Sequence, residues 1–403
     1  MRKLLLSTSF LCACLMAFAQ AWDGSSKSAF TGEGSESKPY LIETPAQLAY
    51  LAEQVNAGNP YEGKYFLQTK ELDLGSKNWT PIGTSETPFK GIYNGNDKAI
   101  YNLSTDPSSA RSSLIGGIEN GTLKHIRIES GHIQAQSNAA AIVYRAKSSN
   151  IEDCSNKANV TVASEFGTVY ASGIASAANE SKIIRCYNTG TISANYALGA
   201  AYATGIAYKA TSIQDCYNTG TIIAKGSGTS VIASGICLNQ QESVLNCYNA
   251  SKLEGSAAYN IAKADRGVTS CYYDNELNTF KDEISNITGL STSAMKSGEA
   301  WAGFDTEVWD FTKGAYPTLK TNGSTTSNEA IKVIEETPSV SVNGRQIVIS
   351  GNIANKVFTM VNVLGSSAEA NTTTGNEVTF TAPSSGIYVI SAQGVKTQKI
   401  IIR

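Results

Sequence analysis

The stretch CYNTGTISANYALGAAYATGIAYKATSIQDCYNTGTI, from Cys186 to Ile222, carries the same six residues, Cys-Tyr-Asn-Thr-Gly-Thr, at its start and near its end. The repetition extends further, because cysteines recur along the chain at steps of 32, 30, 31 and 24 residues. These cysteines are Cys154, Cys186, Cys216, Cys247 and Cys271. Isoleucines precede them by 10 to 12 residues, at Ile142, Ile174, Ile206, Ile236 and Ile261. Two markers that stay in phase indicate a repeated structural unit.

The period of the repeat predicts the fold class. Short segments such as SKIIRCYN and TSIQDCYN alternate apolar and polar residues, and Gly, Asn and Ser separate them. This pattern predicts an all-β chain that winds into a parallel β-helix, one coil per repeat. About thirty residues would give three strands and three turns. A single coil cannot bury its apolar face, whereas stacked coils can.

The shared letters of each repeat can be assigned roles. Strand alternation places the cysteine inside the coil and the following tyrosine outside. The asparagines Asn156, Asn188, Asn218 and Asn249 follow at the bend. Asparagine tolerates the left-handed conformation, and stacked amides can hydrogen-bond from coil to coil. We expect Gly190 and Gly220 to lie where the backbone turns again.

One helix is predicted, in TPAQLAYLAEQVNAG ahead of the coils. Thr44 is the expected N-cap, Pro45 occupies the first helical position, and Gln47 completes a capping box. Gly58 is the expected residue after the C-cap. Because a solenoid needs its open end covered, we expect this helix to cap it. Its apolar face comprises Leu48, Leu51, Ala52 and Val55.

The stretches PYLIETPAQLAYLAEQVN, GKYFLQTKELDL, WTPIG and FKGIYNGNDKAIYNL resemble the opening of bacterial surface proteins that carry GLUG-type repeats. GFDTEVWDFTKGAYPTLK resembles the closing segment of the same proteins, so the resemblance covers residues 22–320. It implies a right-handed parallel β-helix in an exported protein, most typically from a Bacteroides-like organism. Such repeats also occur beside zinc peptidases. That activity does not transfer, because His125 and His132 form no H-E-x-x-H motif.

The character of the sequence changes after Lys320. Residues 321–336 are predicted to be a polar linker. Residues 337–403 alternate as strands with Gly, Asn and Pro-Ser-Ser-Gly turns, which predicts a small β-sandwich. The ending SGIYVI…KIIIR is similar to C-terminal sorting domains of type IX secretion in Bacteroidetes. An immunoglobulin-like accessory domain is the alternative.

Residues 1–19 have a basic start, an apolar run and an A-x-A pattern, which predicts a signal peptide cleaved after Ala19 or Ala21. A lipoprotein signal around Cys12 is the alternative. No later run has the ~20 apolar residues of a membrane helix. Without Arg2 and Lys3, the basic count falls from 32 to 30 against 34 acidic residues. This balance makes nucleic acid and anionic membranes poor partners. We expect an exported protein, at the cell surface or extracellular.

We find no motif for a metal or cofactor, and expect neither. Five of the six mature cysteines follow the repeat, so we expect an inner ladder of buried, unbridged thiols, with bridges between neighbouring coils as the alternative. The residues before the cysteines include Asp153, Arg185 and Asp215. They could form an acid–base–acid catalytic site of a polysaccharide lyase or hydrolase. A surface charge ladder explains them better, because no second carboxylate cluster accompanies them.

The tyrosines that follow the cysteines are the predicted ligand-binding residues: Tyr187, Tyr217, Tyr248 and Tyr272. If the cysteines point inward, these rings stack on an outer face, where they could bind sugars or a protein. The alternative is that they only stabilise the sheet. The sequence therefore favours a non-enzymatic adhesin that binds a glycan or surface protein through the flank of the β-helix. A carbohydrate-active enzyme and a structural surface component are the alternatives.

Overall fold

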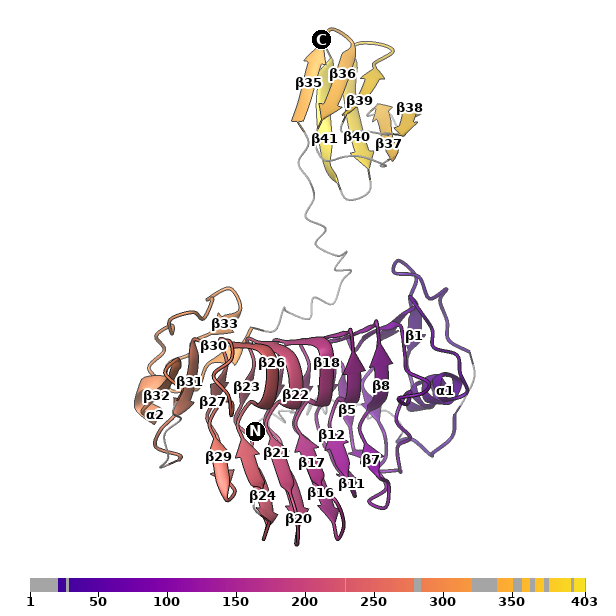
Figure 1. Cartoon of the computed structure of the whole chain (residues 1–403). Helices are drawn as coiled ribbons and strands as arrows, with labels where there is room; N and C mark the ends of the chain where they lie inside the picture. Colours follow the sequence, from indigo (N-terminus) through magenta and orange to yellow (C-terminus); the bar gives the residue numbers. More distant parts are fainter. Residues whose placement is uncertain are drawn as a thin grey trace, which may run out of the picture. The chain divides into compact units, whose positions relative to one another are not determined.

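The computed structural model describes residues 21–26, 29–228, 230–278, 284–320, 339–350, 357–362, 367–372, 377–392 and 395–402. Its main part is a parallel β-solenoid of about seven coils, and its C-terminal part contains small antiparallel sheets (Figure 1). The chain divides into two compact units between these parts. The predicted all-β solenoid is confirmed. The predicted signal peptide 1–19 and linker 321–336 lie outside the described residues.

Within the described residues, the solenoid is built from four parallel sheets. Sheet A contains β1 (Tyr40–Ile42), β2 (Tyr65–Gln68), β4 (Ile92–Asn94), β8 (Ile115–Glu119), β9 (Thr122–Lys124), β13 (Val143–Lys147), β14 (Asn150–Glu152), β18 (Ala175–Ile184), β22 (Ala207–Gln214), β26 (Cys237–Leu245) and β30 (Val268–Thr269). Sheet B contains β3 (Leu72–Asp73), β5 (Ala99–Tyr101), β10 (Arg127–Ile128), β15 (Ser155–Asn156), β19 (Tyr187–Asn188), β23 (Tyr217–Asn218), β27 (Tyr248–Asn249), β31 (Cys271–Asp274) and β32 (Ile287–Leu290).

The other two sheets are shorter along the axis. Sheet C contains β6 (Leu103–Ser104), β11 (Gly131–Ala135), β16 (Asn159–Ser164), β20 (Ile192–Tyr196), β24 (Ile222–Gly226) and β28 (Leu253–Glu254). Sheet D contains β7 (Arg111–Ser112), β12 (Asn138–Ala140), β17 (Val169–Ser172), β21 (Ala201–Thr204), β25 (Val231–Ser234) and β29 (Ala257–Tyr259).

One coil shows where the chain turns, and it corrects the expected three strands. The coil passes through β18, β19, β20 and β21, one strand in each of the four sheets. The extra corner arises because the chain turns both before and after the two-residue strand β19. Arg185 before it is left-handed, with φ 51°. Gly190 after it leaves no room for a side chain, because a Cβ there would lie 2.0 Å from the Ala158 carbonyl oxygen.

A left-handed residue directly precedes each ladder cysteine, and this corrects the prediction that the asparagine takes this conformation. The residues at this corner have φ between 51° and 53°: His125, Asp153, Arg185, Asp215, Asn246 and Ser270. The asparagines that follow the cysteines lie in the short strands of sheet B. The bend therefore falls three residues earlier than expected, at the junction of sheets A and B.

The buried core matches the repeat markers. The five marker isoleucines and the five ladder cysteines are all fully buried in one apolar cluster. Alternation along the strands also holds, since Ala201 and Ala203 are buried while Tyr202 between them is partly exposed. Stacking the coils buries these columns continuously, as expected for a solenoid.

The asparagines form a buried ladder. The Nδ2 of Asn156 donates to Oδ1 of Asn188 at 2.8 Å, Asn188 donates to Asn218 at 2.8 Å, and Asn218 donates to Asn249 at 2.9 Å. Asn188 Nδ2 also donates to the carbonyl oxygen of Gly190. The predicted coil-to-coil hydrogen bonding of these amides is confirmed.

Glycines at the D–A corner make room for this ladder. A Cβ on Gly173 would lie 2.7 Å from Cγ of Asn188. A Cβ on Gly205 would likewise lie 2.6 Å from Cγ of Asn218. The Ser/Thr-Gly-Ile and Cys-Tyr-Asn motifs therefore stay in phase because their residues touch across the coil.

The predicted cap is confirmed. Helix α1 (Pro45–Asn56) lies at the β1 end of the stack (Figure 1). Thr44 and Gln47 form the capping box, and Gly58 is left-handed, with φ 100°. The predicted apolar residues Leu48, Leu51, Ala52 and Val55 are buried in the solenoid core.

Two antiparallel sheets form the C-terminal unit. One contains β35 (Ser339–Asn343), β36 (Gln346–Ser350) and β39 (Glu377–Thr381), and the other contains β37 (Val357–Asn362), β38 (Ser367–Thr372), β40 (Gly386–Ala392) and β41 (Val395–Ile402). Side chains of both sheets, including Phe380 and Tyr388, share one buried cluster. This arrangement is a small β-sandwich.

The contact between glycine and asparagine can be tested by Gly205→Ala. The added methyl would lie 2.0 Å from the Gly235 carbonyl oxygen, so two coils must separate. We expect a loss of about 3 kcal/mol in the free energy of unfolding, measured by chemical denaturation with circular dichroism. Gly167→Ala is the control, because nothing lies within 4 Å of its Cβ position and only its φ of 81° opposes the change. Equal effects of both variants would contradict the packing argument.

Candidate functional site

The tyrosines that follow the ladder cysteines form a column on the outer face of sheet B, as predicted. The rings of Tyr187 and Tyr217 are 4.8 Å apart and 3° from parallel. The rings of Tyr217 and Tyr248 are 5.1 Å apart and 1° from parallel. Parallel strand register places these rings directly above one another.

The expectation that this column is exposed is wrong. The closing segment, residues 291–320, folds over it with α2 (Thr292–Met295) and the hairpin β33 (Trp309–Asp310) and β34 (Thr318–Leu319). Tyr248 is 0% exposed and Tyr217 is 6% exposed, while Tyr187 and Tyr272 are half-buried. The covering residues include Met295, Trp301, Phe304 and Trp309.

Polar atoms of the column also bind the closing segment. Tyr248 donates its hydroxyl to the Pro317 carbonyl oxygen at 2.5 Å, and Tyr272 donates to that of Ala302 at 3.0 Å. Burial raises the pKa of Tyr217 and of Tyr248 well above the usual tyrosine range. The column is therefore packing surface for the chain's own closing segment, and we do not assign it a ligand.

The role of the closing segment can be tested by Trp309→Ala. Trp309 is 1% exposed and contacts the rings of Tyr217 and Tyr248. Its removal leaves a cavity, and we expect a loss of about 3–5 kcal/mol, measured by denaturant unfolding. Phe166→Ala removes a ring that is 80% exposed and serves as control, with an expected change within about 0.5 kcal/mol. A small effect of Trp309→Ala would show that the segment is only loosely attached.

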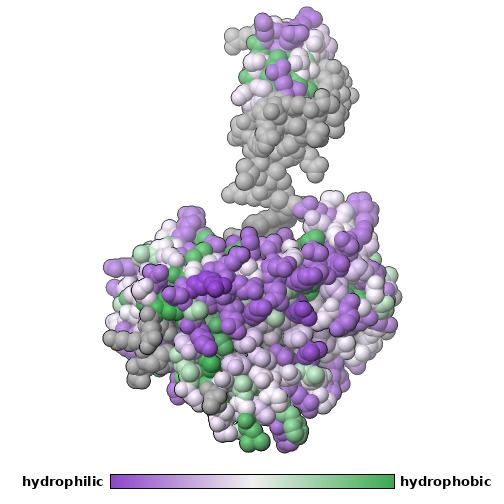
Figure 2. Space-filling view, viewed as in Figure 1, coloured by the Kyte–Doolittle hydropathy of each residue, from purple (hydrophilic) through white to green (hydrophobic). Residues whose placement is uncertain are grey.

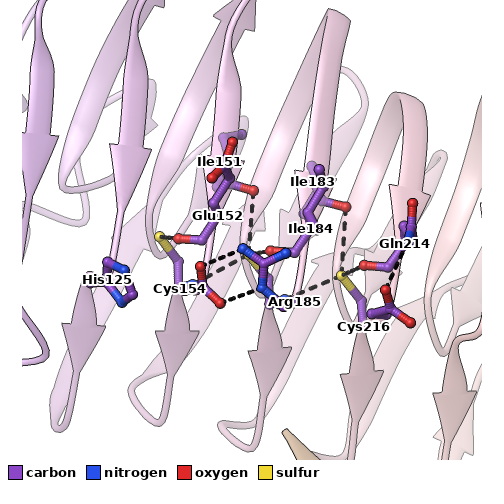
Figure 3. Close-up of polar contacts among 12 residues, drawn as sticks. His125, Ile151, Glu152, Cys154, Ile183, Ile184, Arg185, Gln214 and Cys216 are labelled. Atoms are coloured by element: carbon purple, nitrogen blue, oxygen red, sulfur yellow. Dashed lines mark hydrogen bonds and ion pairs between the residues drawn. The ribbon is translucent and has the colours of Figure 1, made fainter. Parts of the chain in front are cut away.

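The charged residues Asp153, Arg185 and Asp215 lie in one column at the A–B corner, but they do not converge on one point (Figure 3). Arg185 binds Asp153 in a bidentate ion pair, with Nε–Oδ1 and Nη2–Oδ2 distances of 2.7 Å. Asp215 instead accepts hydrogen bonds from Gln214 and from the Trp309 indole N–H. The three residues therefore do not form the convergent acid–base–acid arrangement that catalysis would need.

His125 extends this column by one coil. Its Nδ1 lies 3.5 Å from Oδ2 of Asp97. The hydrogen bond to Asp97 raises the pKa of His125 above its usual value, the charge of Asp153 adds to this effect, and partial burial opposes it. The pair stabilises the fold fully below the unfolded pKa of about 6.5, and this stabilisation is lost as the pH rises through the folded value.

This titration can be measured in the His132→Gln variant. The chain has two histidines, so only the His125 ring signal remains in NMR spectra. We expect a pKa above 6.5, because Asp97 favours the charged imidazole. Adding Asp97→Asn should lower the pKa. If Asp97→Asn leaves the titration unchanged, Asp97 is not the cause of the shift.

The ladder cysteines are unbridged thiols, and Cys237 in β26 is another. Burial raises the pKa of Cys237 to about 12, and those of Cys154, Cys216 and Cys247 also rise. Such thiols behave as small apolar side chains. Among the described residues, no group of three or more His, Cys, Asp or Glu side chains is arranged to hold a metal ion.

A second tyrosine cluster, which the sequence reasoning missed, lies on the outer face of the D–A corner. Tyr170 in β17 is in register with Tyr202 in β21, and their rings are stacked 5.3 Å apart. Tyr208, just beyond the corner in β22, contacts both, at 4.4 Å from Tyr170 and 5.4 Å from Tyr202. All three are partly exposed.

The corner is concave. Side chains pointing outward from sheet D meet side chains pointing outward from sheet A, as Ser176 shows by donating to Asn138 Oδ1 at 3.2 Å. Ile232 and Leu238 also point outward from these sheets, yet they are only 7% and 3% exposed. Burial is the largest cause that raises the pKa of Tyr208 to about 12, and the neighbouring Tyr170 adds to the effect.

The same corner continues toward α1. Tyr144 in β13 occupies the row of sheet A that also holds Ser176 and Tyr208. Arg111 in β7 lies over its ring, with the guanidinium carbon 5.2 Å from the ring centroid. We call these residues the corner strip: Arg111, Tyr144, Tyr170, Tyr202 and Tyr208. In Figure 2, pale residues cover the sheet D strands and a strongly hydrophilic band lies above them over sheet A.

A signal for the strip was present in the sequence. Tyr170 and Tyr202 are 32 residues apart, the same spacing as Cys154 and Cys186. Alternation in TVYAS and AAYAT places both rings outward. What the sequence did not contain is the concave angle between sheets D and A, which brings Tyr208 against them.

Two exposed apolar side chains lie elsewhere, at the turns after β16 and β20. Phe166 is 80% exposed and Leu198 is 78% exposed. Two green patches appear at the lower edge of Figure 2, at the ends of these strands. These residues lie on the far side of sheet D from the corner strip.

No protein-family model matches the chain. A protein of Evansella cellulosilytica named as a Gly-rich membrane protein is 26% identical over 152 residues. The match covers 35% of this chain and 17% of the relative's length. At this identity and coverage the similarity identifies no family. Among the described residues, no helix is long and apolar enough to cross a membrane.

Proposed function

We propose that this is an exported, cell-surface or secreted protein of adhesin type that binds a glycan without chemically altering it. The single observation that carries the proposal is the corner strip. Stacked, partly exposed tyrosines offer flat apolar surfaces to sugar rings and hydroxyls to sugar oxygens. A concave, rigid sheet corner holds them in place on regular strands, which lowers the entropy lost on binding.

The sequence resemblance to surface proteins with GLUG-type repeats supports the location. A signal cleavage after Ala19 or Ala21 would leave Trp22 in the mature chain. Trp22 is buried against Trp79 and donates its backbone N–H to the Asp73 carbonyl oxygen. Either cleavage therefore retains Trp22, the first residue of the chain that belongs to the buried core cluster.

Binding can be tested on a glycan and mucin array with residues 22–403 and the double variant Tyr170→Ala/Tyr202→Ala. We expect the wild type to bind and the variant to lose at least about tenfold in affinity, because each ring supplies stacking area. Tyr101→Ala is the matched control, since Tyr101 is a half-buried tyrosine of sheet B away from the strip. It should bind as the wild type does.

Two results would overturn the proposal. One is the absence of binding to any glycan or mucin by the folded wild type. The other is release of new reducing ends from a bound polysaccharide, which would identify a carbohydrate-active enzyme instead.

A further inference from the structure

The corner strip borders a pocket between α1 and the first coils. The pocket has a volume of about 300 Å³, at the lower end of the range for small-ligand sites. Its lining includes Asn56 from the end of α1, Thr84 and Glu86 from the loop between β3 and β4, Arg111 and Ser112 from β7, and Tyr144 from β13. Arg111 and Tyr144 therefore belong to both the strip and the pocket.

Arg111 is a cation without an acidic partner. In the described part of the chain, no carboxylate lies within 4.0 Å of its guanidinium group, and the side chain is exposed. Arg127 and Arg185 of the same solenoid are each paired with a carboxylate. The contact with the Tyr144 ring orients the guanidinium group and leaves its donors available.

Ser112 and Asn56 also line the pocket, but their unpaired atoms do not open into it. Oγ of Ser112 is buried, because Ser112 is in register with the core residue Ala139, and Oδ1 of Asn56 is buried as well. The Asn56 amide is held in place because its Nδ2 donates to the Pro81 carbonyl oxygen at 3.0 Å. Arg111 and Glu86, by contrast, are exposed side chains of the lining, so a ligand in the pocket can reach both.

We propose that this pocket binds an anionic sugar residue of the glycan that lies along the corner strip, an inference that rests on the proposed function. The carboxylate or sulfate of the sugar faces Arg111, and its hydroxyls donate to Glu86. Arginine suits this role because its planar fork binds either anion through two donors. Glu86 makes no ion pair among the described residues, so its carboxylate accepts hydroxyl donors and disfavours a second anion.

The proposal is tested with the full mature chain on matched glycans: neutral oligosaccharides, the same backbones carrying uronate carboxylates, and the same backbones carrying sulfate esters. We expect at least one anionic series to bind about tenfold more tightly than its neutral counterpart by calorimetry, and this preference to weaken with added salt. The two anionic series distinguish carboxylate from sulfate. The Arg111→Gln variant should lose the anionic preference, so that each anionic glycan binds it no more tightly than the neutral counterpart does.

Arg145→Gln is the control, since Arg145 is an exposed arginine of β13 that does not line the pocket. Unfolding midpoints equal to the wild type would show that both variants fold. Equal affinity for neutral and anionic glycans, or an unchanged preference in Arg111→Gln, overturns this inference but leaves the proposed function standing. Failure of all three series and of the broader array removes the proposed function and this inference together.

Discussion

The buried asparagine ladder is the interaction on which the rest of the solenoid depends. The amides of Asn156, Asn188 and Asn218 each donate to the asparagine of the next coil at 2.8 to 2.9 Å and to a carbonyl oxygen of their own coil. Polar groups in an apolar core are tolerated only when they are paired, so the ladder penalises any coil of the wrong register. The corner glycines add a steric condition, because a Cβ at Gly205 would overlap Asn218. Together these contacts fix the cross-section of the four coils that carry the ladder asparagines.

A constant cross-section leaves the outer rows free to differ. On sheet B the outward tyrosines stack and are covered by the closing segment, which adds an apolar cluster outside the coils. At the D–A corner the outward tyrosines also stack, but no described segment covers them and they stay partly exposed. Stacked tyrosines thus pack against the chain's own closing segment on sheet B, whereas at the D–A corner they remain accessible to solvent.

Much of the fold could be predicted because it follows from local rules. The capping box of α1, its buried face and the inward cysteines each depend on residues within a few positions of one another or on the repeat period. The errors concern the corners. Three strands were expected in place of four because the sequence does not show that the residue before each cysteine is left-handed, and residues as different as Arg185 and Asp215 occupy that position.

The sequence by itself determined the repeat, the inward and outward sides of each strand, and the stacking of like residues, since all three follow from period and alternation. Only the tertiary structure decided which tyrosines are covered. Alternation specifies the side of a sheet but not what lies against that side, and the segment over Tyr217 and Tyr248 comes from far along the chain. Trp309 reaches Asp215 across 94 residues of sequence. The pairing of Tyr208 with Tyr170 likewise needs the angle between two sheets, because a register relates residues within one sheet and not across a corner.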